Sequence, residues 1–229
     1  MKPYQTILFD IDDTLIDFKK SEAISLSKCH DAFYKKSVGF EDFLQDYNKI
    51  NHALWRLAEE NQICASVIGR ERFRQVSELY GFTASEAISA FYEEELIENS
   101  DWVSGAPSLL DALQANGIRI GFITNGFSHM QKRKYRKLNL AQYSEVLVIS
   151  EDIGYAKPHP HIFLHALRLS NAQPAHTLMV GDSLTSDGEG ARGLAMPFCW
   201  YNPDKKPGHP EWQPDFEIAD LASLHAIAH

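Results

Sequence analysis

Five short β-rich runs are the feature that most constrains the fold of this chain. None of them alternates strictly between apolar and polar residues, which is typical of strands that are covered on both faces. Helix-favouring stretches separate them, including 106–116, which a glycine closes, and 161–169, which follows two prolines. The runs are Tyr4 to Phe9, Ile118 to Thr124, Glu145 to Ser150, Thr177 to Gly181 and Met196 to Tyr201. This βαβα alternation predicts a parallel sheet.

The segment between the first and second runs has a different character. It favours helices without convincing strands, and one apolar stripe has the spacing of a helix face. The stripe consists of Phe43, Tyr47, Ile50, Leu54 and Leu57. We therefore predict an α/β fold, with a Rossmann-like parallel sheet core formed by residues 1–17 and 101–229. An all-helical cap, residues 18–100, is inserted after the first strand, and segments 15–18 and 99–107 would be its hinges.

Composition excludes several classes of partner. A chain of 229 residues with a formal charge of −9 lacks the basic surface that nucleic-acid binding needs. Its three cysteines are odd in number and have no CxxC spacing, which favours a reducing compartment, so we expect a cytoplasmic protein. The N-terminal apolar stretch is short and ends at Asp10, so we expect neither a signal peptide nor a membrane span.

Two carboxylates follow the first run, Asp10 and Asp12. The carboxyl ends of strands are where open α/β sheets bind ligands. Residues i and i+2 of a strand point to the same side, so we expect these two side chains to converge. Two carboxylates held together repel, so a proton or a metal ion would neutralise one of them. Such a pair suits a division of labour in which one carboxylate attacks and the other moves protons.

Three further strand ends carry groups that a phosphoryl-transfer site needs. Thr124 and Asn125 end the second run, and their hydroxyl and backbone N–H groups could hold phosphate oxygens. Lys157 follows the third run and could neutralise a phosphoryl group and a carboxylate. Asp182 and Asp187 follow the fourth run and offer the hard oxygen ligands that Mg²⁺ prefers. Each group alone has an ordinary explanation as a turn, cap or surface residue. Their occurrence together at four strand ends of one sheet favours a functional site.

With these residues in hand, the chain resembles the haloacid dehalogenase-like hydrolase superfamily, whose four motifs it carries in order. The resemblance implies that Asp10 attacks phosphorus and becomes an aspartyl-phosphate. It also implies that Asp12 protonates the leaving oxygen, then activates water, and binds the metal through its main-chain carbonyl. The first strand would lie centrally in the sheet.

The resemblance extends to the remaining motifs. Thr124 and Lys157 match the phosphate-holding positions of the superfamily. Asp182 matches a metal ligand, and Asp187 matches the acidic position that supports the metal. Asp182 and Asp187, together with Asp10 and Asp12, would hold Mg²⁺ as the cofactor.

Within the superfamily, the chain is more similar to pyrimidine 5′-nucleotidases with a helical cap, often described as house-cleaning enzymes for non-canonical nucleotides. This implies a Mg²⁺-dependent phosphatase of nucleoside 5′-monophosphates, with pyrimidines preferred. Asn51 and Trp55 of the cap could contact a base, although Trp55 is also explained by helix packing. The stretches that carry this likeness are 9–18, 47–51 with 54–55, 124–126 with Gln131 and Arg133, 150–154 and 199–203.

Other functions stay open on the same fold. The closest alternative keeps the chemistry and changes the substrate to a sugar phosphate or phosphoglycolate. A mutase, a 2-haloacid dehalogenase and a non-catalytic binding protein are further alternatives, although dehalogenases of this superfamily lack an acid at the position of Asp12. For the leading hypothesis, the partner is a small phosphomonoester, and we expect a monomer or weak homodimer.

Overall fold

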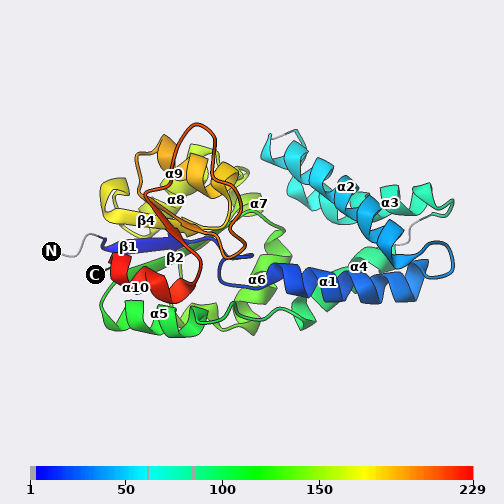
Figure 1. The fold of residues 1–229 in the computed structure, drawn as a ribbon, viewed down its shortest axis with the longest axis horizontal. Coiled ribbons are helices and arrows are strands. Elements are labelled where there is room, and N and C mark those ends of the chain that lie inside the picture. The colour runs from blue at the N-terminus through cyan, green and yellow to red at the C-terminus, as the bar shows by residue number, and fades with distance from the viewer. Residues whose placement is uncertain (1–3, 61, 84–85, 229) are drawn as a thin grey trace. The chain divides into compact units, whose positions relative to one another are not determined.

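The computed structural model describes residues 4–60, 62–83 and 86–228. The chain divides into two compact units, which are described here one at a time (Figure 1). One unit combines the residues up to Asp17 with those from Trp102 onward, and the other runs from Phe18 to Asp101.

The first unit is built on a six-stranded sheet in which every neighbouring pair is parallel. The strand order is β3-β2-β1-β4-β5-β6, so β1 lies between β2 and β4 in the middle of the sheet. The predicted fold class is therefore confirmed. The strands are β1 (Thr6–Phe9), β2 (Arg119–Thr124), β3 (Leu147–Ile149), β4 (Thr177–Gly181), β5 (Phe198–Tyr201) and β6 (Phe216–Ile218).

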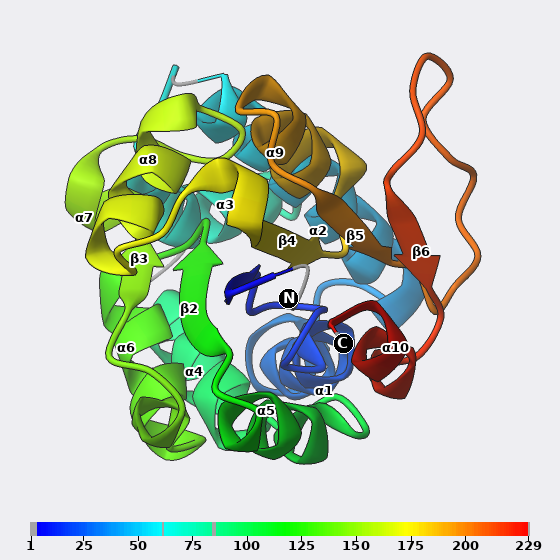
Figure 2. The ribbon, with the colours of Figure 1, turned by 90° about the vertical axis from the view of Figure 1, so that its left-hand side faces the viewer.

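Both faces of the sheet are covered by helices, which explains why the strands do not alternate. Ile7 and Phe9 point to one face and pack with α5 (Ala106–Ala115) and α10 (Leu224–Ala228). Leu8 points to the other face and packs with helices α8 (Pro160–Leu169) and α9 (Glu189–Gly193). All three side chains are fully buried. Figure 2 shows these two helices on one side of the sheet and α5 and α10 on the other. The other helices of this unit are α6 (Ser128–Lys137) and α7 (Ser150–Ile153).

Strand β6 is an element that the sequence pattern does not reveal. It pairs with β5, with Tyr201 opposite Ile218. Only three residues form it, and its central residue, Glu217, interrupts the apolar run. A segment this short carries no periodic signal, and it becomes a strand because β5 offers it an open edge.

The two segments that connect the units pair with each other inside the first unit. Ile16 forms an antiparallel bridge with Trp102. Beside it, the backbone N–H of Val103 donates to the carbonyl oxygen of Leu15 over 2.8 Å. The chain thus leaves and re-enters the first unit at adjacent positions.

The second unit consists of helices in its described residues, as predicted for the cap. Within it, α1 packs against α4 and α2 against α3. The predicted stripe lies on α2, where Phe43 and Tyr47 are fully buried and Leu54 is 6% exposed. The helices are α1 (Phe18–Cys29), α2 (Phe40–Glu59), α3 (Ala65–Leu79) and α4 (Glu86–Glu98), and a π-helical turn (His30–Tyr34) continues α1. Among the described residues of the chain, no helix is long and apolar enough to cross a membrane.

Candidate active site

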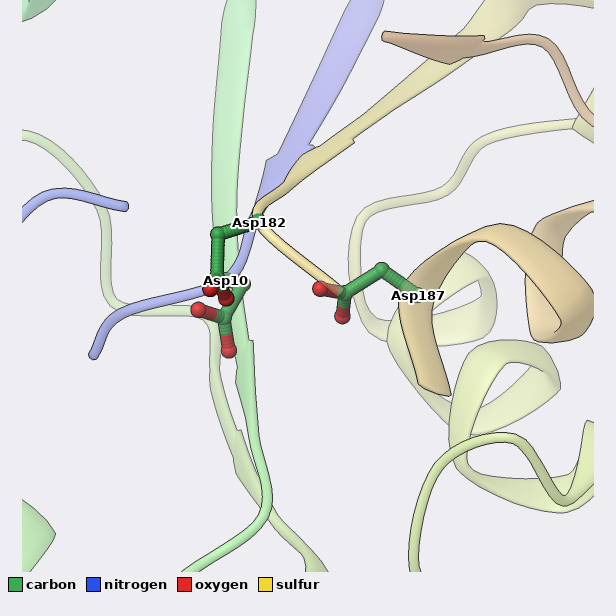
Figure 3. Close-up of side chains that lie close together, drawn as sticks. All are labelled: Asp10, Asp182 and Asp187. Carbon is green, nitrogen blue, oxygen red and sulfur yellow. The ribbon is translucent and has the colours of Figure 1, made fainter. Parts of the chain in front are cut away.

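Three carboxylates meet at the carboxyl end of the sheet. Asp10 follows β1, Asp182 follows β4, and Asp187 lies in the π-helical turn Leu184–Gly188. One oxygen of each lies within 4.8 Å of the others, and Figure 3 shows the three groups gathered at the ends of the strands. The strands β1 and β4 are adjacent and parallel, so their ends bring Asp10 and Asp182 together. Asp187 is oriented by the backbone N–H of Ser183, which donates to its Oδ2 over 3.2 Å.

Lys157 places a positive charge inside this acidic group. Its side chain is 2% exposed, and its Nζ lies 2.6 Å from Asp10 Oδ1 and 2.7 Å from Asp187 Oδ1. It also donates to the carbonyl oxygen of Ile123, near the end of β2, over 3.1 Å. The other carboxylate oxygen of Asp10 accepts from the Thr14 hydroxyl over 3.0 Å. Both oxygens of Asp10 are therefore held by donors.

Burial and charge shift the pKa values of this group. Burial raises the pKa of Asp10 well above its usual value, and Asp187 and Asp182 add to the shift, while Lys157 opposes it. Burial and Asp187 also raise the pKa of Asp182. For Lys157, burial alone would lower the pKa, but Asp10 and Asp187 raise it above its usual value. The group is thus short of positive charge.

The donor set fits a hard divalent cation. Carboxylate oxygens are the ligands that Mg²⁺ prefers, and three of them lie close enough to share one ion. The ammonium of Lys157 contacts Asp10 and Asp187, and that of Lys206 lies 3.4 Å from Asp182 Oδ2. Two positive charges therefore face three carboxylates, and a divalent cation would neutralise the negative charge that remains. The main-chain carbonyl oxygen of Asp182 accepts from Trp200 Nε1 over 2.9 Å. This bond fixes the backbone that carries the Asp182 carboxylate. Mg²⁺ is the predicted cofactor, and these residues accommodate it.

Thr124 and Asn125 lie at the end of β2, beside this group. Thr124 is the last residue of the strand and is 1% exposed. The side chain of Asn125 bonds the backbone of Lys157 twice: Nδ2 donates to the Lys157 carbonyl over 2.9 Å, and Oδ1 accepts from its N–H over 2.7 Å. The sequence predicts that Asn125 holds phosphate, and in the structure its amide supports the segment that carries Lys157.

The carboxylate of Asp12 does not join the other three. Its Oδ1 lies 2.6 Å from Lys134 Nζ, and its Oδ2 accepts from Gln131 Nε2 over 2.7 Å. The expectation that Asp10 and Asp12 converge assumes a strand, but β1 ends at Phe9, so the two-residue repeat of a strand no longer applies.

Sequence reasoning gave no role to Gln131 and did not single out Lys134. Both belong to α6, which begins shortly after Thr124. Their spacing of three puts them on one helix face, and this is the signal that could have identified them.

The proposed substrate contacts of the cap both lie on α2. Asn51 is 8% exposed, and its Oδ1 accepts from the Arg72 guanidinium over 3.2 Å. Arg72 is itself buried, with its guanidinium 4.5 Å from the centre of the Tyr92 ring. Trp55 is half-buried. Within the cap, the side-chain oxygen of Asn51 therefore supports a buried arginine that sequence reasoning missed.

The chain is similar over nearly its whole length to proteins of one hydrolase family. A model of the haloacid dehalogenase-like hydrolases matches residues 4–194. The HAD-hydrolase YfnB of Bacillus subtilis is 35% identical, over 99% of this chain and 96% of that protein. Its crystal structure, bound to magnesium, superposes with a TM-score of 0.85 and covers 99% of each chain at 34% identity.

Two further relatives have a named activity. The pyrimidine 5′-nucleotidase YjjG of Escherichia coli is 33% identical over 96% of each chain. The pyrimidine 5′-nucleotidase PynA of Streptococcus pneumoniae is 30% identical over 96% of this chain and 93% of that protein. Both the extent of the family match and these identities lead to the same conclusion: the chain belongs to the haloacid dehalogenase-like hydrolases.

Proposed function

We propose that this protein is a Mg²⁺-dependent phosphatase that hydrolyses nucleoside 5′-monophosphates, with pyrimidines preferred, through an aspartyl-phosphate on Asp10. The observation that carries the proposal is the buried contact of Asp10 with Lys157, next to two further carboxylates. The substrate class rests on the similarity to two pyrimidine 5′-nucleotidases.

In the first half of the reaction, a carboxylate oxygen of Asp10 attacks the phosphorus atom. The bond between phosphorus and the ester oxygen breaks, and the leaving oxygen takes a proton from Asp12. The ammonium of Lys157 stabilises the ionised form of Asp10, which is the nucleophile, and offsets charge on the phosphoryl oxygens. Thr124 and the backbone after it would bind those oxygens.

In the second half, water attacks the phosphorus atom of the aspartyl-phosphate. Asp12 takes a proton from this water, and the bond between phosphorus and Asp10 breaks, which releases inorganic phosphate and restores the carboxylate. Asp10, Asp182 and Asp187, with the main-chain carbonyl of Asp12, would hold Mg²⁺, which supplies further charge neutralisation for the phosphoryl group.

The cap is proposed to select the leaving group. Phosphoryl transfer needs mainly positioning and charge neutralisation, so the core can supply the chemistry while residues elsewhere discriminate between substrates. Trp55 is the proposed base contact, because its large ring is only half-buried in the cap. Asn51 would act beside it through the part of its amide that does not bind Arg72.

The test is phosphate release from a panel that contains UMP, dTMP, purine monophosphates, sugar phosphates and phosphoglycolate, with Mg²⁺ and with EDTA. Asp10→Asn serves as the control for contaminating phosphatases. The proposal predicts that pyrimidine monophosphates lead, that EDTA abolishes release, and that the variant is silent. Faster release from sugar phosphates or phosphoglycolate would replace the substrate class. Release that survives Asp10→Asn would contradict the proposal.

A further inference from the structure

Two side chains of α6 hold the carboxylate of Asp12 from both sides. Lys134 Nζ lies 2.6 Å from Oδ1, and Gln131 Nε2 lies 2.7 Å from Oδ2. The two donors are 3% and 2% exposed, whereas the side chain of Asp12 is 23% exposed. The donors are therefore fixed by their surroundings, while the carboxylate that they hold stays accessible. Each carboxylate oxygen has a second lone pair that can still accept or carry a proton.

The orientation of the Gln131 amide is set by its hydrogen bond to Asp12. Among the described residues, no donor reaches its buried Oε1. A buried acceptor without a partner is destabilising, because it has lost its hydrogen bonds to water. Turning the amide over would not remove the problem, because the carbonyl oxygen would then face the carboxylate of Asp12. The amide thus keeps its N–H group on Asp12 although its own oxygen has no donor.

Space for this amide exists because residue 126 is a glycine. A Cβ atom at Gly126 would lie 2.6 Å from Gln131 Nε2 and 3.1 Å from its Cγ. The buried glutamine has little room to withdraw from such a contact. The backbone that follows β2 is therefore shaped to let α6 reach Asp12.

We propose that Gln131 and Lys134 are positioning residues that fix the carboxylate of Asp12 for proton transfer to the leaving oxygen. This inference rests on the proposed function, in which Asp12 is the acid and base. General acid catalysis contributes roughly 10²–10⁴-fold, and it does so only where the leaving oxygen needs a proton. Displacing the carboxylate should therefore slow reactions with poor leaving groups and spare those with good ones.

The experiment compares kcat/KM for two substrates in the full-length protein with saturating Mg²⁺. One is UMP, or the alkyl phosphate of the panel that the wild type hydrolyses fastest. The other is p-nitrophenyl phosphate, whose leaving group departs without a proton. Because kcat/KM covers only the steps up to release of the leaving group, the later attack by water does not enter the comparison.

The variants are Gln131→Leu and Lys134→Met, with Lys134→Arg as the conservative replacement. We expect kcat/KM for the alkyl phosphate to fall about 10- to 100-fold in the first two, and kcat/KM for p-nitrophenyl phosphate to change by less than about threefold. Lys134→Arg keeps a donor and should recover most of the loss. Lys132→Met is the matched control, because Lys132 lies on the same helix but pairs with Asp152 at the surface.

The outcomes separate the two proposals. An equal loss on both substrates, or no loss on the alkyl phosphate, overturns the positioning role and leaves the phosphatase assignment intact. A wild type that releases phosphate from neither substrate overturns the proposed function and this inference with it. Because Lys134→Arg retains the positive charge and Gln131→Leu changes the other donor, these two variants test the proposal even if Lys134→Met fails to fold.

Discussion

Lys157 and Asp187 form a buried ion pair, with 2.7 Å between the lysine Nζ and the carboxylate Oδ1. The same ammonium contacts Asp10, so one lysine links the proposed nucleophile to the proposed metal site. Neither partner of the pair is more than 2% exposed. Because both groups are buried, each charge is stabilised by its partner and not by water.

Replacing Lys157 with methionine should destabilise the protein strongly. The change leaves buried carboxylates without their cation, and breaking a buried pair in this way costs about 3–5 kcal/mol. Urea unfolding in EDTA measures the loss. Lys132→Met removes an exposed pair with Asp152 and should cost no more than about 1 kcal/mol. Equal losses in the two variants would mean that the charge of Lys157 is not structurally required.

Adding a methyl group at Gly181 should displace Asp187. A Cβ atom at this last residue of β4 would lie 2.2 Å from Asp187 Oδ2, so the carboxylate must move. We expect Gly181→Ala to cost about 1–3 kcal/mol of stability and to weaken both Mg²⁺ binding and activity. Thermal melting at rising Mg²⁺ concentration gives the affinity. Gly193→Ala is the control, because nothing lies within 4 Å of the added atom there. Unchanged Mg²⁺ affinity in Gly181→Ala would show that Asp187 does not support the metal.

Stabilisation by Mg²⁺ should depend on pH. Burial raises the pKa of Asp10 and Asp182 above the usual 3.8. In the pH window between 3.8 and these raised pKa values, the two groups therefore bind more protons in the folded metal-free protein than in the unfolded chain. The contribution of these two groups to stability should therefore rise as the pH falls toward 3.8, where the unfolded carboxyls also bind protons. Lys157 is charged in both states throughout this window and adds no slope.

Protons and Mg²⁺ then compete for the same carboxylates. The difference in melting temperature between samples with Mg²⁺ and with EDTA should be largest near about pH 8 and should shrink toward about pH 5. Differential scanning fluorimetry across this range measures it. A difference that stays constant with pH would indicate that Mg²⁺ binds elsewhere.

Asn51→Ala should destabilise the cap. The substitution removes the oxygen that accepts from the buried Arg72 guanidinium, and such a loss costs about 1–3 kcal/mol. Asn48→Ala changes a half-buried residue on the same helix and should alter stability by less than about 0.5 kcal/mol. Urea unfolding compares the two variants. If Asn51→Ala is as stable as Asn48→Ala but has a raised KM for UMP, Asn51 serves the substrate and not the cap.

The sheet could be predicted because burial on both faces leaves a signal in the sequence. Phe9 and Leu8 are fully buried on opposite faces, so the run that contains them shows no alternation. The gathering of Asp10, Asp182 and Lys157 followed from the same reasoning, since parallel strands end at one edge of a sheet. Strand β6 was missed because its pairing depends on β5 and not on its own three residues.

The surroundings of Asp12 could not be predicted in the same way. Its orientation depends on where β1 ends and on two side chains of α6 that lie about 120 positions later in the chain. The helix spacing puts Gln131 and Lys134 on one face, but it does not say which carboxylate that face meets. Likewise, nothing in the sequence indicates that the amide of Asn125 would bind the backbone of Lys157.

The covalent intermediate on Asp10 is the central claim, and trapping it is the most direct test. The Asp12→Asn variant is mixed with p-nitrophenyl phosphate and Mg²⁺, quenched in acid within the first turnover, digested and mapped by mass spectrometry. Because this substrate needs no acid but water still needs a base, we predict a burst of one p-nitrophenol per chain and a phosphoryl group on Asp10. A burst without phosphorylated Asp10, or a phosphoryl group on another residue, would contradict the account.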